Sequence, residues 1–341
     1  MPVVNQNTSE SHPDTFFPDQ TLYDACCDGD LDQVERSLAE GVNVNAAMND
    51  GFTALMLASS NGHTDVTVRL IKAGADVNAA RTEDGGTSLL HAAQENNTNC
   101  LKALIEAKAD LNARAKGGAT ALWIAAQIGN TDCAKLLINA GADINAALLD
   151  GATPLFIAAQ NGNTDCLKAL IEGSANINAR TLSGATALMV AAQEGNTDCV
   201  KLLIHTEADL NAVNRSGATA LFVAAQKGNT DCLKLLINAG ADLNARTQEG
   251  ATPLFAAAQE NNTDCVKLLI NTGADLNARF ENGATALFIA ALKGYTDCVK
   301  LLISAGADLN SWTKLGTTPL SIATQKGNTG CAKALIKAGA K

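Results

Sequence analysis

Cysteine is the residue whose number and spacing in this chain could support chemistry. The sequence of 341 residues has ten cysteines, and eight of them recur every 33 residues. Thiols can form disulfides, bind a metal ion or act as nucleophiles, depending on their surroundings. The eight periodic positions are Cys100, Cys133, Cys166, Cys199, Cys232, Cys265, Cys298 and Cys331.

The spacing favours buried thiols that act as small apolar groups. Equivalent atoms of neighbouring repeats lie about 10 Å apart when helices pack, whereas a disulfide needs Cα atoms within about 7 Å. The sequence has no Cys-x-x-Cys pair and no histidines clustered with the cysteines for zinc. A large number of reduced thiols indicates a reducing compartment. We therefore expect a cytoplasmic protein or one delivered into a reducing host cytosol. Cys27 replaces a recurring glutamine and is expected to be exposed, which leaves a reactive role open.

Other residues with catalytic potential form no recognisable set. The histidines are scattered at His12, His63, His91 and His205, without a repeated Ser/Cys–His–acid arrangement. Neither a G-x-x-x-x-G-K-[ST] loop nor a dinucleotide-binding glycine loop is present. We therefore expect no enzyme activity, no cofactor and no metal site.

A 33-residue repeat must position these side chains. A clear copy is GATPLFIAAQNGNTDCLKALIEGSANINAR at residues 151–180. One spacing, from Gly51 to Gly85, is 34 because RTEDGG carries an extra residue before Thr87. A period in this range is typical of solenoids of repeated units. The opening Gly-x-Thr begins at Gly51, Gly85, Gly118, Gly151, Gly184, Gly217, Gly250, Gly283 and Gly316.

The residue pattern of each repeat predicts two helices and a projecting turn. Thr153 is expected to cap the first helix, with Pro154 just inside it, and Gly162 to end it. Either Asn163 or Thr164 caps the second helix. The segment SANINAR then leads through an extended turn to the next glycine. One such unit buries its apolar face only when it is stacked on its neighbours.

These units resemble ankyrin repeats, whose motif runs roughly G-x-T-P-L-H-x-A-A-x-x-G-H through L-L-x-x-G-A-D-V-N. The matches include Gly-Ala-Thr-Pro-Leu at 151–155 and 250–254, Ala-Ala at 125–126, Leu-Leu-Ile at 136–138 and Gly-Ala-Asp-Ile-Asn-Ala at 141–146. The resemblance implies an all-α repeat fold, an ankyrin-repeat solenoid of stacked helix-turn-helix units with projecting β-turn or hairpin loops.

The resemblance covers about residues 20–341, as an ankyrin repeat domain of about ten repeats. Residues 1–19 are expected to form a polar N-terminal tail, in which Phe16 and Phe17 could pack on the first repeat. The first repeat, residues 21–50, and the last, from Gly316, carry extra charged residues. Those charges suit end repeats, which have one face exposed to solvent, so we expect both repeats to act as caps.

Charge and hydropathy limit the classes of partner that the chain is expected to bind. The net charge is −10 and the sequence pI is about 4.9, which argues against nucleic acid or an anionic membrane as the main partner. No apolar run approaches the 18–20 residues of a spanning helix, so we expect no membrane insertion. The first twenty residues show no secretory signal pattern.

The repeats depart from the family motif at its two histidines. The second survives only as His63 and is mostly Asn elsewhere. We expect these changes to replace side-chain hydrogen bonds with apolar contact between repeats. The glycine that ends the second helix is also replaced, by Lys108, Ser174 and Glu207, at a cost of about 1 kcal/mol each. The first histidine is replaced by Met56, Leu90, Trp123, Phe156, Met189, Phe222, Phe255, Phe288 and Ser321.

Two rows of positions vary on an otherwise constant scaffold. A glutamine recurs near the end of the first helix, and the residue after it differs between repeats. The turn tips differ as well, and Trp312 replaces a recurring arginine. The helix-end row comprises Ile128, Asn161, Glu194, Lys227, Glu260, Lys293 and Lys326. The tip row comprises Lys116, Leu149, Leu182, Arg215, Gln248, Glu281 and Lys314.

The resemblance implies that the helix-end row lines a concave, partner-binding groove, with the tip row along one edge of it. Neutral drift at solvent positions would produce the same variation, so both interpretations stay open. The glutamines could instead hydrogen-bond along the stack and stabilise it without a ligand. Trp312 could anchor a partner or pack against the last repeat.

The function that we expect is that of a protein–protein interaction module. It would bind another protein through the groove and the turn tips as a monomer, and it would not bind nucleic acid. The alternative is a structural scaffold, or a host-directed effector or adaptor without a single dedicated partner.

Overall fold

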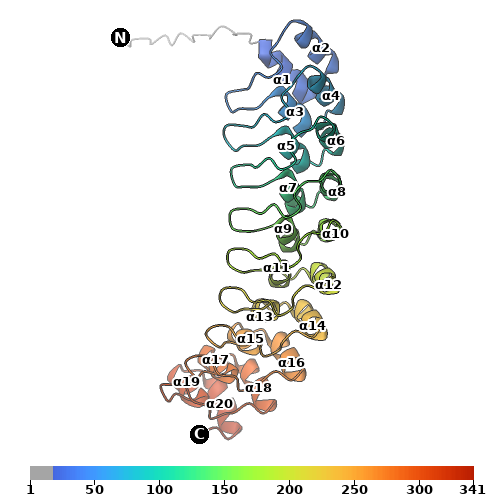
Figure 1. The fold of residues 1–341 in the computed structure, drawn as a ribbon. Coiled ribbons are helices and arrows are strands. Elements are labelled where there is room, and N and C mark those ends of the chain that lie inside the picture. Colours follow the sequence, from blue (N-terminus) through green and yellow to red (C-terminus); the bar gives the residue numbers. More distant parts are fainter. Residues whose placement is uncertain (1–17) are drawn as a thin grey trace, which may run out of the picture. The chain divides into compact units, whose positions relative to one another are not determined.

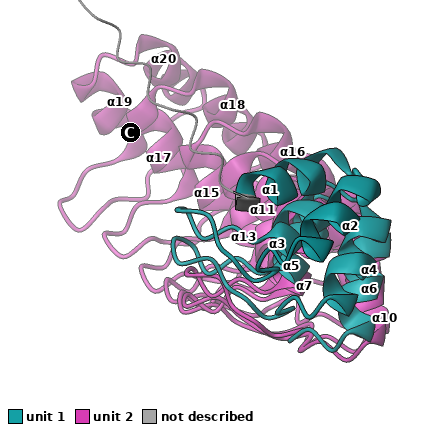
Figure 2. Ribbon diagram, turned by 90° about the horizontal axis from the view of Figure 1, so that it is seen from above, with its two compact units in different colours: residues 1–110 teal, residues 111–341 magenta. Residues whose placement is uncertain are grey.

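The computed structural model describes residues 18–341. These residues form twenty helices, and they contain no β-strand beyond two isolated bridges. The chain divides into two compact units, residues 1–110 and residues 111–341 (Figure 2). The first helix begins at Pro18, so nearly all of the predicted tail, with His12, Phe16 and Phe17, lies outside the described residues. The predicted domain boundary and the two cap repeats stay predictions.

Unit 1 contains three helix pairs. Each pair has the predicted helix-turn-helix form, and long turns follow the second helix of a pair (Figure 1). The helices are α1 (Pro18–Asp28), α2 (Leu31–Ala39), α3 (Ala54–Ser60), α4 (Thr64–Lys72), α5 (Ser88–Gln94) and α6 (Thr98–Glu106).

Unit 2 contains seven helix pairs. Along α7 to α14 the long turns project beyond the odd-numbered helices, on the side away from the even-numbered ones (Figure 1). The helices are α7 (Ala121–Ile128), α8 (Thr131–Asn139), α9 (Pro154–Asn161), α10 (Thr164–Glu172), α11 (Ala187–Glu194), α12 (Thr197–His205), α13 (Ala220–Lys227), α14 (Thr230–Asn238), α15 (Pro253–Gln259), α16 (Thr263–Asn271), α17 (Ala286–Lys293), α18 (Thr296–Ser304), α19 (Pro319–Gln325) and α20 (Thr329–Lys337).

The predicted helix boundaries are confirmed in the repeat that begins at Gly151. The Thr153 hydroxyl accepts a hydrogen bond from the backbone N–H of Phe156 at 3.2 Å, and Pro154 occupies the first turn. Gly162 ends α9 with φ +73°, in the left-handed region where glycine is strain-free. Asn163 precedes α10 but makes no capping bond with its side chain.

The periodic cysteines form part of the core. All ten cysteines lie among the described residues, none is in a disulfide, and only Cys27 is exposed, as predicted. The thiols are more than apolar filling, however. The Thr131 hydroxyl lies 3.3 Å from Cys166 Sγ, and Thr230 lies 3.4 Å from Cys265 Sγ. Each of these thiols therefore links its repeat to the preceding one through a weak hydrogen bond.

The positions of the first motif histidine are mostly core, as predicted. Trp123, Phe255 and Phe288 are buried, and burying a ring of this size contributes about 2–3 kcal/mol. Phe156 and Phe222 are half-buried. Ser321, at the same position in α19, is exposed and completes the capping box at Thr318.

At the second motif histidine, the prediction that hydrogen bonds are lost was wrong. The Asn163 side-chain amide donates to the carbonyl oxygens of Ala126 and Gln127, at 2.9 Å each. These oxygens end α7, where a helix has no partners of its own for its last carbonyls. The same pair of bonds recurs from Asn196, Asn229, Asn262 and Asn328 in unit 2 and from Asn97 in unit 1. We call these residues the asparagine ladder.

The asparagine ladder predicts a specific loss of stability. In the variant Asn229→Ala, the carbonyls of Ala192 and Gln193 lose their donor, so the free energy of unfolding should fall by about 1–3 kcal/mol. The matched variant is Asn229→His, because His63 in unit 1 lies with its Nε2 2.8 Å from the Cys27 carbonyl oxygen. Urea unfolding should show most of the loss restored by histidine. Equal losses in the two variants would contradict the role given to the amide.

Candidate protein-interaction surface

The turn tips of unit 2 are tied together by backbone hydrogen bonds. The N–H of Arg215 donates to the Ser183 carbonyl at 2.8 Å, and the N–H of Gln248 donates to the Ser216 carbonyl at 2.9 Å. Five such bonds join six consecutive turns, from the turn that contains Asp150 to the turn that contains Lys314. The donors are Leu182, Arg215, Gln248, Glu281 and Lys314. The tip row therefore presents varied side chains from regularly spaced, hydrogen-bonded backbone positions.

A second set of bonds fixes the base of each turn. The Asn211 side-chain oxygen accepts from the N–H of Asp242 at 2.9 Å, and the Asp242 carboxylate accepts from the N–H of Asn244 at 2.9 Å. The bond from one repeat to the next spans 31 residues. It recurs with Asn112, Asn145, Asn178, Asn244, Asn277 and Asn310 as acceptors in unit 2.

All fifteen residues of the two rows and Trp312 are exposed, and all belong to unit 2. Several are large and apolar: Leu149 is 87% exposed and Leu182 is 61% exposed, both in the tip row. Exposed apolar side chains on a fixed backbone are suited to protein contacts. Exposure alone does not test binding, so the role of these residues stays a prediction.

A pocket lies between a turn tip and two helices in the middle of unit 2. It has a volume of about 280 Å³. The turn contributes Gln248 and Glu249, α13 contributes Phe222 and Gln226, and α15 contributes Phe255 and Gln259. Tip and helix residues thus share one hollow there, as the groove interpretation requires. Of the predicted site residues, Gln248 is the one that lines the pocket.

Phe280 completes the pocket, and sequence reasoning missed it. Its ring lies against the ring of Phe255, with centroids 5.1 Å apart and planes at 9°. Threonine occupies the equivalent place in neighbouring repeats, at Thr181, Thr247 and Thr313. The signal in the sequence was an aromatic residue at a turn position where the repeats on either side have threonine.

Trp312 is exposed, which favours the surface interpretation over packing. Its exposed fraction is 60%, and the guanidinium carbon of Arg279 lies 5.6 Å from its ring centre. At the equivalent position of earlier repeats, Arg114 donates to the Ala147 carbonyl at 2.8 Å and Arg180 to the Val213 carbonyl at 2.9 Å. Trp312 replaces such an arginine with an exposed ring.

The glutamine side chains do not bond from repeat to repeat where their bonds are defined. Gln193 Nε2 donates to Glu194 at 2.9 Å, and Gln259 Nε2 donates to Glu260 at 3.1 Å. Both acceptors are the next residue of the same repeat. The bonds along the stack at this level come instead from the asparagine ladder, which donates to the backbone carbonyls of the glutamines.

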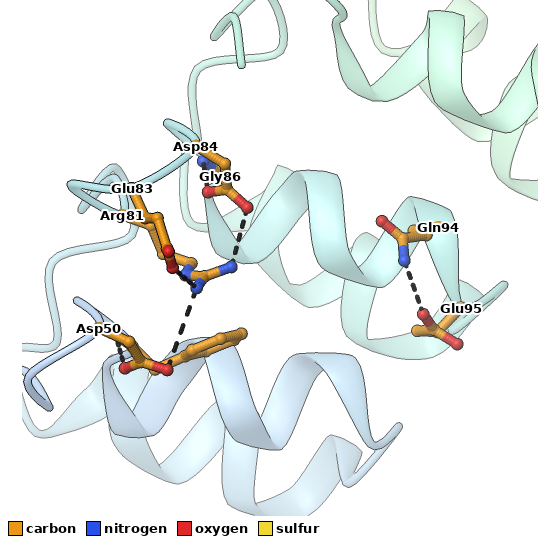
Figure 3. A network of polar contacts seen from close by, with 8 residues as sticks. Asp50, Arg81, Glu83, Asp84, Gly86, Gln94 and Glu95 are labelled. Carbon is orange, nitrogen blue, oxygen red and sulfur yellow. Dashed lines mark hydrogen bonds and ion pairs between the residues drawn. The ribbon is translucent and has the colours of Figure 1, made fainter. Parts of the chain in front are cut away.

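The extra residue of the 34-residue repeat belongs to a buried arginine site in unit 1. Arg81, whose side chain is 13% exposed, pairs with Asp84 at 2.8 Å and Glu83 at 2.9 Å (Figure 3). Its guanidinium carbon lies 4.1 Å from the ring centre of Phe52, and that ring stacks on His91 at 5.1 Å. Burial lowers the pKa of His91 below its ordinary value.

The described residues provide no recognisable catalytic or metal site. His63 lies against a backbone carbonyl, as does His205, whose Nδ1 is 2.6 Å from the Lys201 oxygen. No group of three or more potential metal ligands occurs between residues 18 and 341. Within the same range, no helix is long and apolar enough to cross a membrane.

The negative charge of the chain is concentrated in unit 1. Residues 1–110 contain 17 acidic and 6 basic residues, a net charge of −11, whereas residues 111–341 contain 18 acidic and 19 basic residues, a net charge of +1. The two values add up to the −10 of the whole chain. The net negative charge therefore argues against anionic partners only for unit 1. At unit 2, which is almost neutral, the partner must be selected by individual side chains of the binding surface.

Comparison with known proteins agrees with the geometry. In solved structures, the human ASB11 ankyrin repeat domain matches with a TM-score of 0.58 and 28% sequence identity, over 64% of this chain and 98% of that one. Short segments match two curated proteins. The human mitochondrial disaggregase is 42% identical over 60 residues, and the fission yeast (Schizosaccharomyces pombe) ankyrin repeat-containing protein P1E11.10 is 37% identical over 57 residues. The matched segments span 8% and 28% of those proteins.

The family itself is matched along nearly the whole described chain. The sequence model described as ankyrin repeats (3 copies) matches residues 22–115, 69–147, 122–214, 188–280 and 273–341. The structure has the paired helices, the capping threonines and the projecting turns that were expected from the ankyrin motif in the sequence. The chain therefore belongs to the ankyrin repeat family.

Proposed function

We propose that this chain binds another protein through the inner surface of unit 2, defined as the tip row, the helix-end row and Trp312. Ankyrin repeats are generally protein–protein interaction modules, and the fold is generally non-catalytic. The observation that carries the proposal is the pocket, because Gln248 of a turn tip and Gln226 and Gln259 of two helices line the same hollow.

The mechanism is recognition by a preformed surface. Backbone bonds between tips and the asparagine ladder fix the positions from which the varied side chains project. A surface that is ordered before binding loses little conformational entropy when a partner docks. The protein acts as a monomer, and its cysteines, none of them in a disulfide, suit a reducing compartment.

A capture experiment with matched variants tests the proposal. The chain is used as bait in reducing cell lysate, beside a variant in which Lys227, Glu260 and Lys293 are all alanine. A control variant has Lys201, Asp231 and Lys267 changed to alanine; these are two bases and one acid that are exposed on even-numbered helices. We expect the first variant to lose a captured protein by about tenfold or more and the control to keep it. Equal capture by all three chains would move the search away from the helix-end row, and equal loss in both variants would contradict a localised surface.

A further inference from the structure

The pocket between α13, α15 and the tip at Gln248 combines aromatic walls with one carboxylate. Phe222, Phe255 and Phe280 provide the rings. Glu249 is the one charged residue among those that line it, and no basic side chain is in the described lining. Gln226 and Gln259 add amide groups at the helix ends.

The size of the pocket fits one amino-acid side chain. Sites for drug-sized ligands are clefts of about 300–1,000 Å³. The volume here, about 280 Å³, lies just below that range. A single side chain of a docked protein would fill it, in the way that interface hot spots place one residue in a desolvated hollow.

The chemistry of the walls favours a positive charge. Ring faces attract cations electrostatically, and guanidinium groups stack on them readily. The carboxylate of Glu249 supplies an acceptor for a charge-assisted hydrogen bond. Because Gln259 donates its amide nitrogen to Glu260, its amide oxygen is left to accept. Unit 2 as a whole is almost neutral, so this preference comes from the pocket itself.

Unit 1 already holds an arginine in the same kind of environment. Arg81 lies over the ring of Phe52 at 4.1 Å and pairs with the carboxylates of Glu83 and Asp84. Figure 3 shows this arginine enclosed by acidic side chains. In unit 2, the rings and the carboxylate are present without an arginine of the chain's own.

We propose that the pocket receives an arginine side chain of the partner protein. Its guanidinium would stack on the phenylalanine rings, pair with Glu249 and donate to the amide oxygens of Gln226 and Gln259. The inference rests on the proposed function, since it names the partner residue that the inner surface recognises.

The test uses small mimics of the side chain. N-acetyl-arginine amide and N-acetyl-citrulline amide have nearly the same shape, but only the first is charged. Each is titrated into the full ¹⁵N-labelled chain while the side-chain amide signals of Gln226 and Gln259 are followed by NMR. We expect saturable shifts with the arginine compound and binding about tenfold weaker with citrulline. N-acetyl-lysine amide should fall between them, because its ammonium cannot stack.

Variants then assign the binding to the pocket. Glu249→Gln should weaken arginine binding about tenfold, whereas Glu281→Gln, in the next tip and outside the pocket lining, should leave it unchanged. Phe280→Thr should abolish it and still fold, because threonine is native at the equivalent positions of neighbouring repeats. Equal binding of arginine and citrulline, or no effect of Glu249→Gln, would overturn the proposal.

The outcome separates this inference from the proposed function. If the arginine compound does not bind but the helix-end variant still loses its captured protein, the pocket assignment is wrong and the inner surface stands. If arginine binds and the helix-end variant captures as well as the parent chain, the pocket is real but that row is not the recognition surface.

Discussion

Replacing Gly217 with alanine is expected to lower the free energy of unfolding by about 3–5 kcal/mol. Gly217 has φ +82°, and a Cβ built on it lies 2.8 Å from the backbone nitrogen of Gln248 and 2.9 Å from the Cα of Thr247. Both neighbours are backbone atoms of the next turn and cannot rotate away. Backbone strain at positive φ costs about 1–3 kcal/mol, and overpacking adds a similar amount.

The matched control is Gly240→Ala. Gly240 has φ +90°, but nothing lies within 4 Å of its added Cβ, so the cost should be about 1 kcal/mol. The chain supports this expectation, because Ser174 and Glu207 occupy the equivalent position with φ +69° and +62°. Urea unfolding of the two variants separates the steric effect from the backbone effect. Similar losses in both would show that contact between turns contributes little to stability.

The same substitution should also affect the inner surface. Gly217 follows Ser216, whose carbonyl accepts the tip bond from Gln248 at 2.9 Å. Pushing the two turns apart would lengthen that bond and displace the pocket wall. Gly217→Ala is therefore expected to weaken partner binding even below its unfolding temperature, whereas Gly240→Ala is not.

Raising the pH above 9 is expected to destabilise unit 2 by several kcal/mol. Burial, with smaller contributions from nearby charges, raises the pKa of Cys133 and of Cys298 from 9.0 to about 11. Between these values an unfolded thiol loses its proton while the folded one keeps it. Stability is therefore full below pH 9 and falls as pH rises to about 11, by about 1.4 kcal/mol per pH unit for each thiol. Each thiol then accounts for about 3 kcal/mol.

The double variant Cys133→Ala/Cys298→Ala isolates this effect from the titration of lysines. At pH 7, where both thiols are protonated, its urea midpoint sets the baseline for the two lost side chains. Between pH 9 and 10.5, its free energy of unfolding should decline less steeply with pH than that of the parent chain. The difference in slope should correspond to up to two fewer protons released on unfolding. Parallel pH profiles would mean that the two thiols ionise as easily in the folded chain as in the unfolded one.

Local features of the repeat were predictable from the sequence because their partners are close in the chain. Thr153 bonds to a residue three positions later, and Gly162 acts through its own φ angle. The role of Asn163 was not predictable in the same way. Its capping position is local, but its amide bonds to carbonyls 36 and 37 residues earlier, and a period of 33 does not reveal which atoms face each other.

The candidate site was predicted in part for the same reason. Variation between repeats located the exposed rows, because solvent positions are free to differ. The pocket depends on three segments that meet in space: α13, the turn at Gln248 with the helix α15 that follows it, and the turn that contains Phe280. For Phe222 and Phe255 the sequence favoured a core role over a binding stripe, although both side chains also line that hollow.

The constant separations of the bonds between repeats have a consequence for how such a chain changes in evolution. In unit 2, the recurring bonds from one repeat to the next have fixed separations, for example 31, 35, 36 and 37 positions in side-chain bonds and 32 positions in the tip bonds. Because the donors and acceptors recur every 33 residues, deletion or duplication of 33 residues at a repeat boundary brings each donor to an acceptor of the same kind. Unequal recombination can therefore lengthen or shorten the array while the hydrogen bonds between adjacent repeats are kept. The length of the tip row can then change in evolution by one whole repeat at a time.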